Sequence, residues 1–282
     1  PKLAQAAVVD ALAQKAGTSA TDAAPTVDAA RAFLADTEAA ATKETTHEVA
    51  GVVVAGKEIR LWSTGQTWKL FDLGAECVER YGSPFMMFHR GDLHKVLLDA
   101  IRAVRPDAIV LGRKCTGISQ GGETVTISFE NGKTASAPVV IGADGVQSRV
   151  RGTLWGADRP EFTGIVAWRG LIPRDQVPAG VKMDVGTNWV GPGGHVVHYP
   201  VRGGELLNFV GLLERDDWRV ESWTIPGTTD ECLRDLGPWH GDVHNIIRAI
   251  DTPFKWALLK REPGKYNYGS IGNGSLSHLA ME

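Results

Sequence analysis

One stretch of eleven residues, 141–151, carries most of the information about the fold: Ile141-Gly142-Ala143-Asp144-Gly145-Val146-Gln147-Ser148-Arg149-Val150-Arg151. The apolar residues 138–141 lead into it and predict a short buried strand ending in glycines, which allow a ligand to approach the backbone closely. An acid at the carboxyl end of a strand is where a doubly wound α/β fold hydrogen-bonds ribose hydroxyls. The serine and arginines that follow can hold a phosphate or brace the turn. The alternative is a plain glycine turn with a surface acid.

The elements predicted around this stretch give a fold class of α/β with α+β character, a nucleotide-type portion followed by a mostly β portion. Apolar residues recur on one face of residues 92–104, which predicts a helix with Asp92 as its N-cap. The pairs Gly56-Lys57 and Asn131-Gly132 each predict a tight hairpin turn between two strands. The other predicted helices are residues 230–236 and 243–250. The predicted strands are residues 49–55, 58–62, 108–111, 124–130, 133–137, 138–141, 165–171, 182–185, 196–201 and 206–213, and residues 68–73 are a further short apolar stretch.

Composition and charge exclude several classes of protein. The 282 residues carry 30 Lys+Arg against 33 Asp+Glu, a net charge of −3, so the chain lacks the basic surplus that binds polyanions. Three widely spaced cysteines fit neither a disulfide framework nor a metal-binding knuckle. No apolar run approaches the ~18 residues of a membrane span, and the first residues do not resemble a signal peptide. A soluble, cytoplasmic protein is expected, with no nucleic-acid or membrane partner and no metal site.

Three further stretches point, with residues 141–151, to one family: Phe88-His89-Arg90-Gly91-Asp92-Leu93-His94, Ala167-Trp168-Arg169-Gly170-Leu171-Ile172-Pro173, and Gly191-Pro192-Gly193-Gly194-His195 through Tyr199-Pro200-Val201. Together they resemble motifs of the FAD-dependent aromatic hydroxylases, the single-component flavin monooxygenases related to para-hydroxybenzoate hydroxylase. The resemblance covers roughly residues 51–263 and is closest to the branch of 3-hydroxybenzoate 6-hydroxylase and of salicylate or hydroxynicotinate hydroxylase. It implies a partial FAD-binding Rossmann-like domain and a β-sheet substrate domain.

The resemblance also implies a domain organisation with atypical ends. Residues 51–158 correspond to the partial FAD-binding domain with a β-hairpin, and residues 159–262 to the substrate-binding domain. Residues 1–50 are rich in alanine and contain none of the nine tryptophans, so a helical or disordered segment unlike the family is expected there. Residues 263–282 form an atypical tail. The G-x-G-x-x-G turn and the glycine-aspartate-alanine-alanine-histidine-proline segment of the family do not occur, so truncation at both ends is expected.

A histidine and a tyrosine in the predicted substrate sheet form the candidate catalytic pair. If residues 195–201 are a strand, alternation puts His195 and Tyr199 on one face and His198 on the other. His195 and Tyr199 could then share a ligand, whereas His195 and His198 could not easily share a metal. A histidine can accept the proton of a phenol, and a tyrosine hydroxyl can orient the substrate. The resemblance implies these roles, and a histidine and tyrosine merely packed in the sheet are the alternative.

The resemblance implies an activity as well as a fold. The expected enzyme is an FAD- and NAD(P)H-dependent monooxygenase that uses O2 to hydroxylate a small phenolic acid of the hydroxybenzoate or salicylate type. His195 would be the base and Tyr199 would orient the substrate. The alternative is a non-catalytic remnant that binds an aromatic acid or a protein partner, and a homodimer is left open. The expected cofactor-binding residues are Arg90, which precedes a predicted helix N-terminus suited to an anion, and Asp144, Gly142 and Gly145.

Two other patterns in the sequence have weaker claims to function. Residues 117–121 match the G-x-S-x-G elbow of hydrolases, which requires a helix after the serine. Residues from 124 onward predict a strand instead, so a hydrolase is not expected. His240 and His244 have a spacing that can bind zinc, but Gly241 weakens a helix there and no third ligand is evident.

Overall fold

The computed structural model describes residue 32 and residues 51–122, 124–156, 159–215, 217 and 225–260. The alanine-rich segment 1–50, apart from residue 32, and the tail 263–282 lie outside the described residues. The described chain divides into two compact units. One is built from residues 99–161 with residues 259–260, and the other from residues 51–98 and 162–258.

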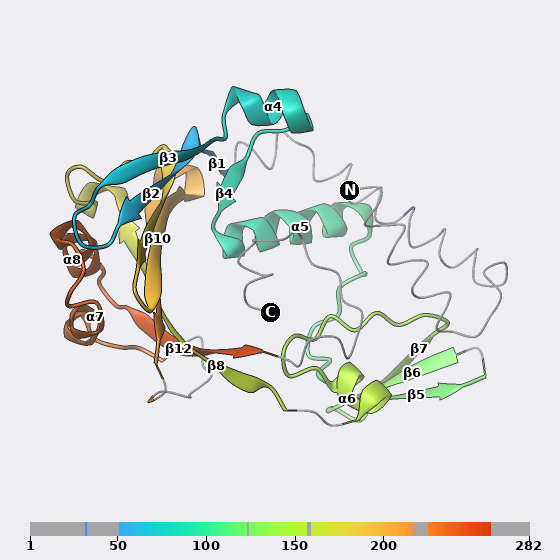
Figure 1. Cartoon of the computed structure of the whole chain (residues 1–282). Coiled ribbons are helices and arrows are strands. Elements are labelled where there is room, and N and C mark those ends of the chain that lie inside the picture. The colour runs from blue at the N-terminus through green and yellow to red at the C-terminus, as the bar shows by residue number, and fades with distance from the viewer. Residues whose placement is uncertain are drawn as a thin grey trace. The chain divides into compact units, whose positions relative to one another are not determined.

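A seven-stranded sheet forms the centre of the second unit, with strand order β12-β8-β11-β10-β9-β2-β3. Its neighbours β8, β11, β10 and β9 pair antiparallel, whereas β2 joins β9 in parallel (Figure 1). The hairpin of β2 and β3 is therefore part of the sheet that, by the resemblance, is expected to bind the substrate. The strands are β2 (Gly56–Leu61), β3 (Thr67–Asp72), β8 (Glu161–Pro173), β9 (Val185–Gly191), β10 (Gly194–Val201), β11 (Leu206–Glu214) and β12 (Phe254–Lys260).

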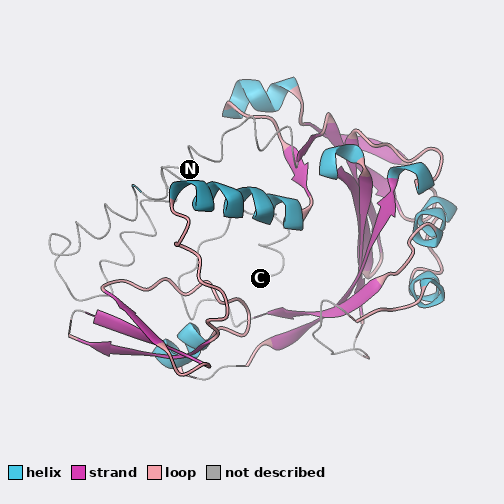
Figure 2. Cartoon of the chain, turned by 180° about the vertical axis from the view of Figure 1, so that it is seen from behind, coloured by secondary structure: helices cyan, strands magenta, loops and turns pink. Residues whose placement is uncertain are grey.

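Two short helices, α7 (Thr229–Asp235) and α8 (Gly241–Arg248), cover one face of this sheet (Figures 1 and 2). A capping box starts α7, since the Thr228 hydroxyl accepts from the Glu231 amide and the Glu231 carboxylate accepts from the Thr228 amide. The alternation of the strands sends every second side chain toward the helices, and this layer is the hydrophobic core. Its fully buried members include Trp168, Trp189, Leu207, Phe209, Leu236, Val243, Ile246 and Ile247.

The segment that follows β3 in the sequence contains α4 (Ala75–Tyr81), β4 (Met86–Phe88) and α5 (Arg90–Val104). The predicted helix over residues 92–104 is confirmed, but it begins at Arg90, so Asp92 lies in its first turn and is not the N-cap. The predicted hairpin at Gly56-Lys57 is wrong, because β1 (Gly51–Val53) pairs with β4 and not with β2. The wrong partner was predicted because local turn signals cannot report a pairing with a strand more than 30 residues away.

The first unit contains a three-stranded antiparallel sheet of β5 (Cys115–Gly121), β6 (Thr124–Phe129) and β7 (Thr134–Ala137), followed by α6 (Arg149–Trp155). The predicted hairpin of residues 124–137 is confirmed, and Gly132 supplies the left-handed turn with φ 77°. The strand predicted after residues 117–121 is also confirmed as β6. A hydrolase elbow needs a helix at that place, so residues 117–121 do not form one. The strands predicted over residues 108–111 and 138–141 are wrong.

Those two segments lack a hydrogen-bonded neighbour strand among the described residues of this unit, and an apolar run alone does not make a strand. Each segment also has an apolar side chain that is well exposed, Leu111 at 79% and Ile141 at 64%. The fold class is nevertheless mixed α/β, as predicted. Among the helices that the structure describes, none is long and apolar enough to cross a membrane.

Candidate functional site

The predicted catalytic pair lies on the open face of the seven-stranded sheet, the face turned away from α7 and α8. Directly paired residues on neighbouring strands point to the same face, so the register defines three rows of side chains across β10, β11 and β8. His195 and Tyr199 belong to two of these rows and share the face, as the alternation predicts. The rows are His195–Leu212–Ala167, Val197–Val210–Arg169 and Tyr199–Asn208–Leu171.

His195 is half-buried at the start of β10. Burial lowers the pKa of its imidazole below the usual 6.5, and the charge of Lys57 lowers it further. The ring is therefore mostly neutral at pH 7, with one nitrogen lone pair able to accept a proton. A neutral histidine is the state that a general base requires.

Tyr199 has the opposite perturbation at the other end of the strand. Burial raises the pKa of its phenol above 10, although the nearby positive charges of Arg169 and Arg90 lower it in part. The hydroxyl is thus protonated at neutral pH and can donate a hydrogen bond. The two arginines, from β8 and from the start of α5, both lie near enough to affect the tyrosine electrostatically.

A third polar side chain of this face, Arg169, was not predicted as a site residue. It is half-buried on β8, and it makes no hydrogen bond or ion pair with any residue in the described part of the chain. Burial lowers the pKa of its guanidinium and the charge of Arg90 lowers it further, while Tyr199 raises it. The sequence held a signal, because alternation in a strand places this charge between Ala167 and Leu171 on one apolar face.

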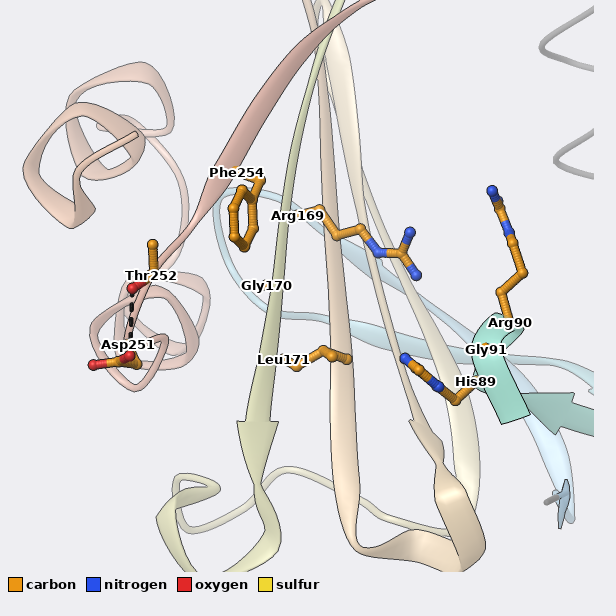
Figure 3. A pocket seen from close by; sticks show the side chains of 9 residues that line it. All are labelled: His89, Arg90, Gly91, Arg169, Gly170, Leu171, Asp251, Thr252 and Phe254. Atoms are coloured by element: carbon orange, nitrogen blue, oxygen red, sulfur yellow. Dashed lines mark hydrogen bonds between the residues drawn. The ribbon is translucent and has the colours of Figure 1, made fainter. Parts of the chain in front are cut away.

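A pocket of about 480 Å³ opens beside these residues (Figure 3). Arg169 and Leu171 extend from β8 toward the side where Arg90 begins α5 and His89 precedes it. His195 and Tyr199 do not line this pocket and lie further along the same sheet face. The lining residues are His89, Arg90, Gly91, Arg169, Gly170, Leu171, Asp251, Thr252 and Phe254.

An ion-pair cluster holds the first turn of α5, and therefore Arg90, against the end of β10. Asp92 accepts two hydrogen bonds from Arg202, at 2.9 and 2.8 Å, and Arg202 also contacts Nδ1 of His89 at 3.3 Å. The Arg202 hydrogen bonds, which outweigh burial, lower the pKa of the Asp92 carboxyl below its usual value. Arg202 has a left-handed backbone with φ 53°, the only non-glycine residue in the described ranges with positive φ. The cluster shows that Asp92 joins the helix to the sheet.

The predicted cofactor residues Asp144, Gly142 and Gly145 belong to the first unit. The Asp144 carboxylate accepts hydrogen bonds from the Ser148 hydroxyl at 2.5 Å and from the amides of Arg149 and Val150 at 2.7 and 3.2 Å. Burial raises its pKa, but these hydrogen bonds outweigh that effect and lower it overall. Asp144 thus organises the turn into α6. The local structure also explains why glycine stands at positions 142 and 145.

A Cβ at Gly142 would lie 2.7 Å from Cγ1 of Val150, so packing against α6 excludes a larger residue there. Gly145 has φ 77°, which L-residues rarely adopt, and no atom lies within 4 Å of the position its Cβ would take. Open space at Gly145 is what close approach of a ligand to the backbone would need. The cofactor roles of the three residues stay predictions.

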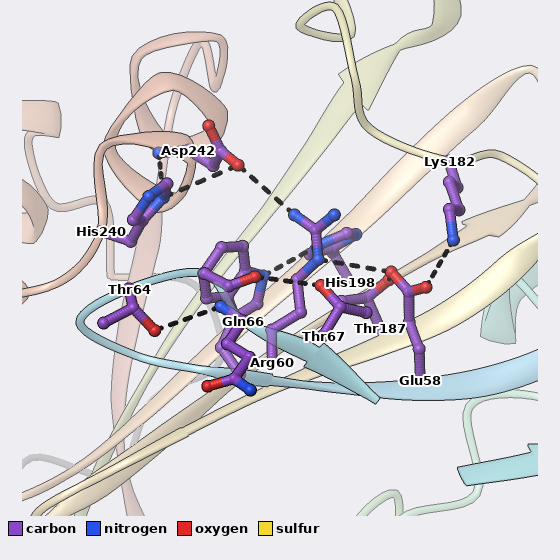
Figure 4. Close-up of polar contacts among 12 residues, drawn as sticks. Glu58, Arg60, Thr64, Gln66, Thr67, Lys182, Thr187, His198, His240 and Asp242 are labelled. Carbon is purple, nitrogen blue, oxygen red and sulfur yellow. Dashed lines mark hydrogen bonds and ion pairs between the residues drawn. The ribbon is translucent and has the colours of Figure 1, made fainter. Parts of the chain in front are cut away.

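The opposite face of β10 carries a buried polar network that excludes His198 from the candidate site (Figure 4). Trp189 donates its indole N–H to Nε2 of His198 at 3.2 Å, and burial lowers the pKa of that histidine to about 4. Beside it, the buried Glu58 accepts from Lys182 at 2.6 Å and from Thr187 at 3.1 Å. The network stabilises the sheet from behind and leaves His195 as the histidine of the open face of β10.

Comparison with known proteins shows which family of enzymes this chain belongs to. The chain is related in sequence to aromatic-ring monooxygenases, which confirms the predicted resemblance to the flavin-dependent aromatic hydroxylases. It is 36% identical to a 3-amino-4-hydroxybenzoate 2-monooxygenase of Streptomyces platensis over 205 residues, 73% of this chain and 51% of the relative. It is 32% identical to a 6-hydroxynicotinate 3-monooxygenase of Pseudomonas fluorescens, over 72% of this chain and 53% of that protein. The chain thus spans about half the length of these relatives, and no family model matches it.

Solved structures support the same relationship. A salicylate hydroxylase substrate complex superposes with a TM-score of 0.60 at 26% identity, covering 76% of this chain and 55% of that one. HpxO of Klebsiella pneumoniae, complexed with FAD and uric acid, gives a TM-score of 0.62 at 25% identity and covers 75% of this chain and 53% of its own. The mixed α/β fold is therefore that of FAD-dependent hydroxylases.

Proposed function

We propose that this chain carries the substrate-binding part of an FAD- and NAD(P)H-dependent monooxygenase that uses O2 to hydroxylate a small phenolic acid of the hydroxybenzoate or salicylate type. The observation that carries the proposal is the sheet face shared by His195, whose imidazole is neutral, and Tyr199, whose hydroxyl is protonated. The relatives support it, because they are named for hydroxylation of aminohydroxybenzoate, hydroxynicotinate and hydroxybenzoate rings.

The residues present fit a flavin cofactor in two places. Asp144 is exposed, and a carboxylate oxygen can accept more than one hydrogen bond, so a ribityl or ribose hydroxyl could donate to it beside the Ser148 hydroxyl. Arg90 is exposed at the first residue of α5 and lines the pocket, where a cation suits an anionic group of the cofactor. Gly145 would keep the backbone beside Asp144 open to it, whereas the cofactor role of Gly142 rests on the resemblance alone, because Val150 fills the position of its Cβ.

The chemistry divides between the cofactor and the protein. FAD, reduced by NAD(P)H, would supply an electrophilic oxygen equivalent derived from O2. His195 would accept the proton of the substrate phenol, which raises the electron density of the ring and favours attack on such an electrophile. Tyr199 would donate a hydrogen bond to the substrate and fix its orientation over the sheet.

The visible spectrum of the purified chain with added FAD, followed by NAD(P)H oxidation with and without 3-hydroxybenzoate, tests this proposal. Flavin absorbance and product formation that depends on the hydroxybenzoate are expected. His195→Ala should then lower turnover at least 100-fold, the order of a lost general base, and leave the flavin content unchanged. His94→Ala is the matched control, because His94 is exposed on α5.

The outcomes separate the proposal from its alternative. A colourless chain that still binds hydroxybenzoate would support a non-catalytic protein that binds aromatic acids. Equal loss of flavin and turnover in His195→Ala, or loss of neither, would contradict the assignment of His195 as the base.

A further inference from the structure

The sheet face that carries His195 and Tyr199 also holds a buried amide with no hydrogen-bond partner. Asn208 lies on β11, and only 1% of its surface is exposed. Neither its Nδ2 nor its Oδ1 atom has a partner in the described part of the chain. An unpaired polar group is costly to bury, so nearly all such groups in folded proteins bond to protein, to a ligand or to ordered water. Asn208 therefore marks a place where another molecule is bound.

The register places Asn208 beside the tyrosine of the candidate pair. It is paired directly with Tyr199 of β10 on one side and with Leu171 of β8 on the other, so the three side chains point to the same face. Side chains two positions apart along a strand also share a face, and the neighbours of Asn208 along β11 are Leu206 and Val210. Among the side chains of these four neighbours, the Tyr199 hydroxyl is the only group that can form a hydrogen bond with the amide.

The amide of Asn208 and the hydroxyl of Tyr199 do not meet directly. Side chains in a strand stand roughly perpendicular to the sheet, and a tyrosine carries its hydroxyl much further from the backbone than an asparagine carries its amide. A molecule that joins the two groups must both accept and donate hydrogen bonds. Water has this capacity, and a buried water typically makes about three hydrogen bonds to polar groups that are otherwise unpaired.

We propose that Asn208 holds a buried water that orients the hydroxyl of Tyr199. The N–H and C=O groups on one side of a carboxamide can bind the same water, which accepts from Nδ2 and donates to Oδ1. The second hydrogen of this water donates to the phenolic oxygen of Tyr199, so the proton of the tyrosine points away from the water. The inference rests on the proposed function, in which that proton is donated to the substrate. Asn208 is then a positioning residue that acts through Tyr199.

A double-mutant cycle in the full chain, measured by urea denaturation, tests the water site without any substrate. Asn208→Leu removes the amide at nearly constant volume, and Tyr199→Phe removes only the hydroxyl. The double substitution should change the unfolding equilibrium constant about 5-fold less than the product of the two separate effects, which corresponds to one neutral hydrogen bond. Tyr81→Phe, at a tyrosine that is 71% exposed, is the matched control and should be additive with Asn208→Leu. Asn208→Ala takes the place of Asn208→Leu in the cycle if the leucine variant does not fold.

Equilibrium binding of 3-hydroxybenzoate and of benzoate, measured by calorimetry with FAD present, tests the orienting role. The two acids differ only in the ring hydroxyl that Tyr199 would contact. Asn208→Leu should weaken binding of 3-hydroxybenzoate about 10-fold and that of benzoate less than about 2-fold. In the Tyr199→Phe background the same substitution should weaken neither by more than about 2-fold, a result that a purely structural role of Asn208 would not give. Asn245→Leu, at an exposed position of α8, is the matched control and should leave both affinities unchanged.

The outcomes separate the water site from the proposed function. Additive effects of Asn208→Leu and Tyr199→Phe on unfolding would overturn the bridge between the two residues, as would a crystal structure with no ordered water between them. Coupling in unfolding without selective weakening of 3-hydroxybenzoate, in a chain that binds this acid, would overturn the orienting role. A wild-type chain that binds neither acid would overturn the proposed function, while the unfolding cycle still decides the water site.

Discussion

Glu58→Gln is the sharpest test of the buried network behind β10. The carboxylate of Glu58 has a side-chain exposure of 7% and accepts from the Lys182 ammonium at 2.6 Å and from the Thr187 hydroxyl at 3.1 Å. The Arg60 guanidinium lies 3.4 Å away. Glutamine keeps the volume of the side chain and removes its charge, so the variant isolates the electrostatic contribution.

The size of the stability loss depends on which contacts Lys182, Arg60 and Thr187 keep in the variant. Removal of one member of a fully buried ion pair costs about 3–5 kcal/mol, because the other charge stays buried without compensation. Lys182 is half exposed and can return to water, and Arg60 keeps Asp242 at 3.3 Å. The glutamine oxygen can also still accept from Thr187. We therefore expect the free energy of unfolding to fall by about 2 kcal/mol at pH 7.

The stability difference between wild type and variant should also depend on pH, in a direction set by the pKa of Glu58. Burial raises the pKa of Glu58, but the hydrogen bond and charge of Lys182, with Thr187 and Arg60, outweigh it and hold the pKa below the usual 4.5. A depressed pKa stabilises the folded state above pH 4.5 and loses that contribution as pH falls through the folded value. The difference between wild type and variant should be constant from pH 7 to 5 and shrink below 4.5.

Urea denaturation followed by tryptophan fluorescence measures both quantities. Glu79→Gln, at an exposed position of α4, is the matched control and should change the unfolding free energy by less than about 0.5 kcal/mol. A Glu58→Gln difference below that value, or one that grows on acidification, would refute the reasoning.

Three further predictions concern the site and its support. Asp92→Asn should lower the unfolding free energy by about 1 kcal/mol through the weakened bidentate contact with Arg202, measured by urea denaturation; no change would mean that the contact contributes nothing in solution. Because the pKa of His195 is depressed, the turnover of a hydroxybenzoate should be flat above pH 6.5 and fall only below it, and a limb centred above 6.5 would contradict this. Gly170→Ala puts a Cβ 2.5 Å from Cγ2 of Ile250, so the free energy of unfolding should fall by about 1–3 kcal/mol and the melting temperature by several degrees. An unchanged melting temperature would show that Ile250 moves aside freely.

Much of the substrate sheet could be predicted from the sequence, because its strands alternate regularly between core and open face. Val196 and His198 point into the core beside Trp189, while His195 and Tyr199 point away, as period-two alternation requires. The 124–137 hairpin was equally accessible, since Asn-Gly turns carry their conformation in two residues. These features depend on neighbours within a few positions.

Other features depend on partners distant in sequence and were missed. The apolar residues 138–141 have the composition of a strand, but no described strand of their unit pairs with them. Asp92 is of a residue type that often caps helices, yet its carboxylate accepts hydrogen bonds from Arg202, 110 residues later in the chain. Arg169 was visible as a charge within an apolar strand, but its pairing with Val210 of β11 depends on a strand far away in the sequence.

The order of strands in the seven-stranded sheet has a consequence for synthesis on the ribosome. The hairpin of β2 and β3 emerges early, but the inner edge of β2 pairs with β9, and Glu58 meets Thr187 across 129 residues. Closing a loop of that length costs about 4 kcal/mol of chain entropy before any contact offsets it. The nascent hairpin therefore waits with an open edge until β9 has left the exit tunnel. During that interval a neighbouring nascent chain or a chaperone can reach the unpaired edge of β2, which exposes this strand to mispairing during translation.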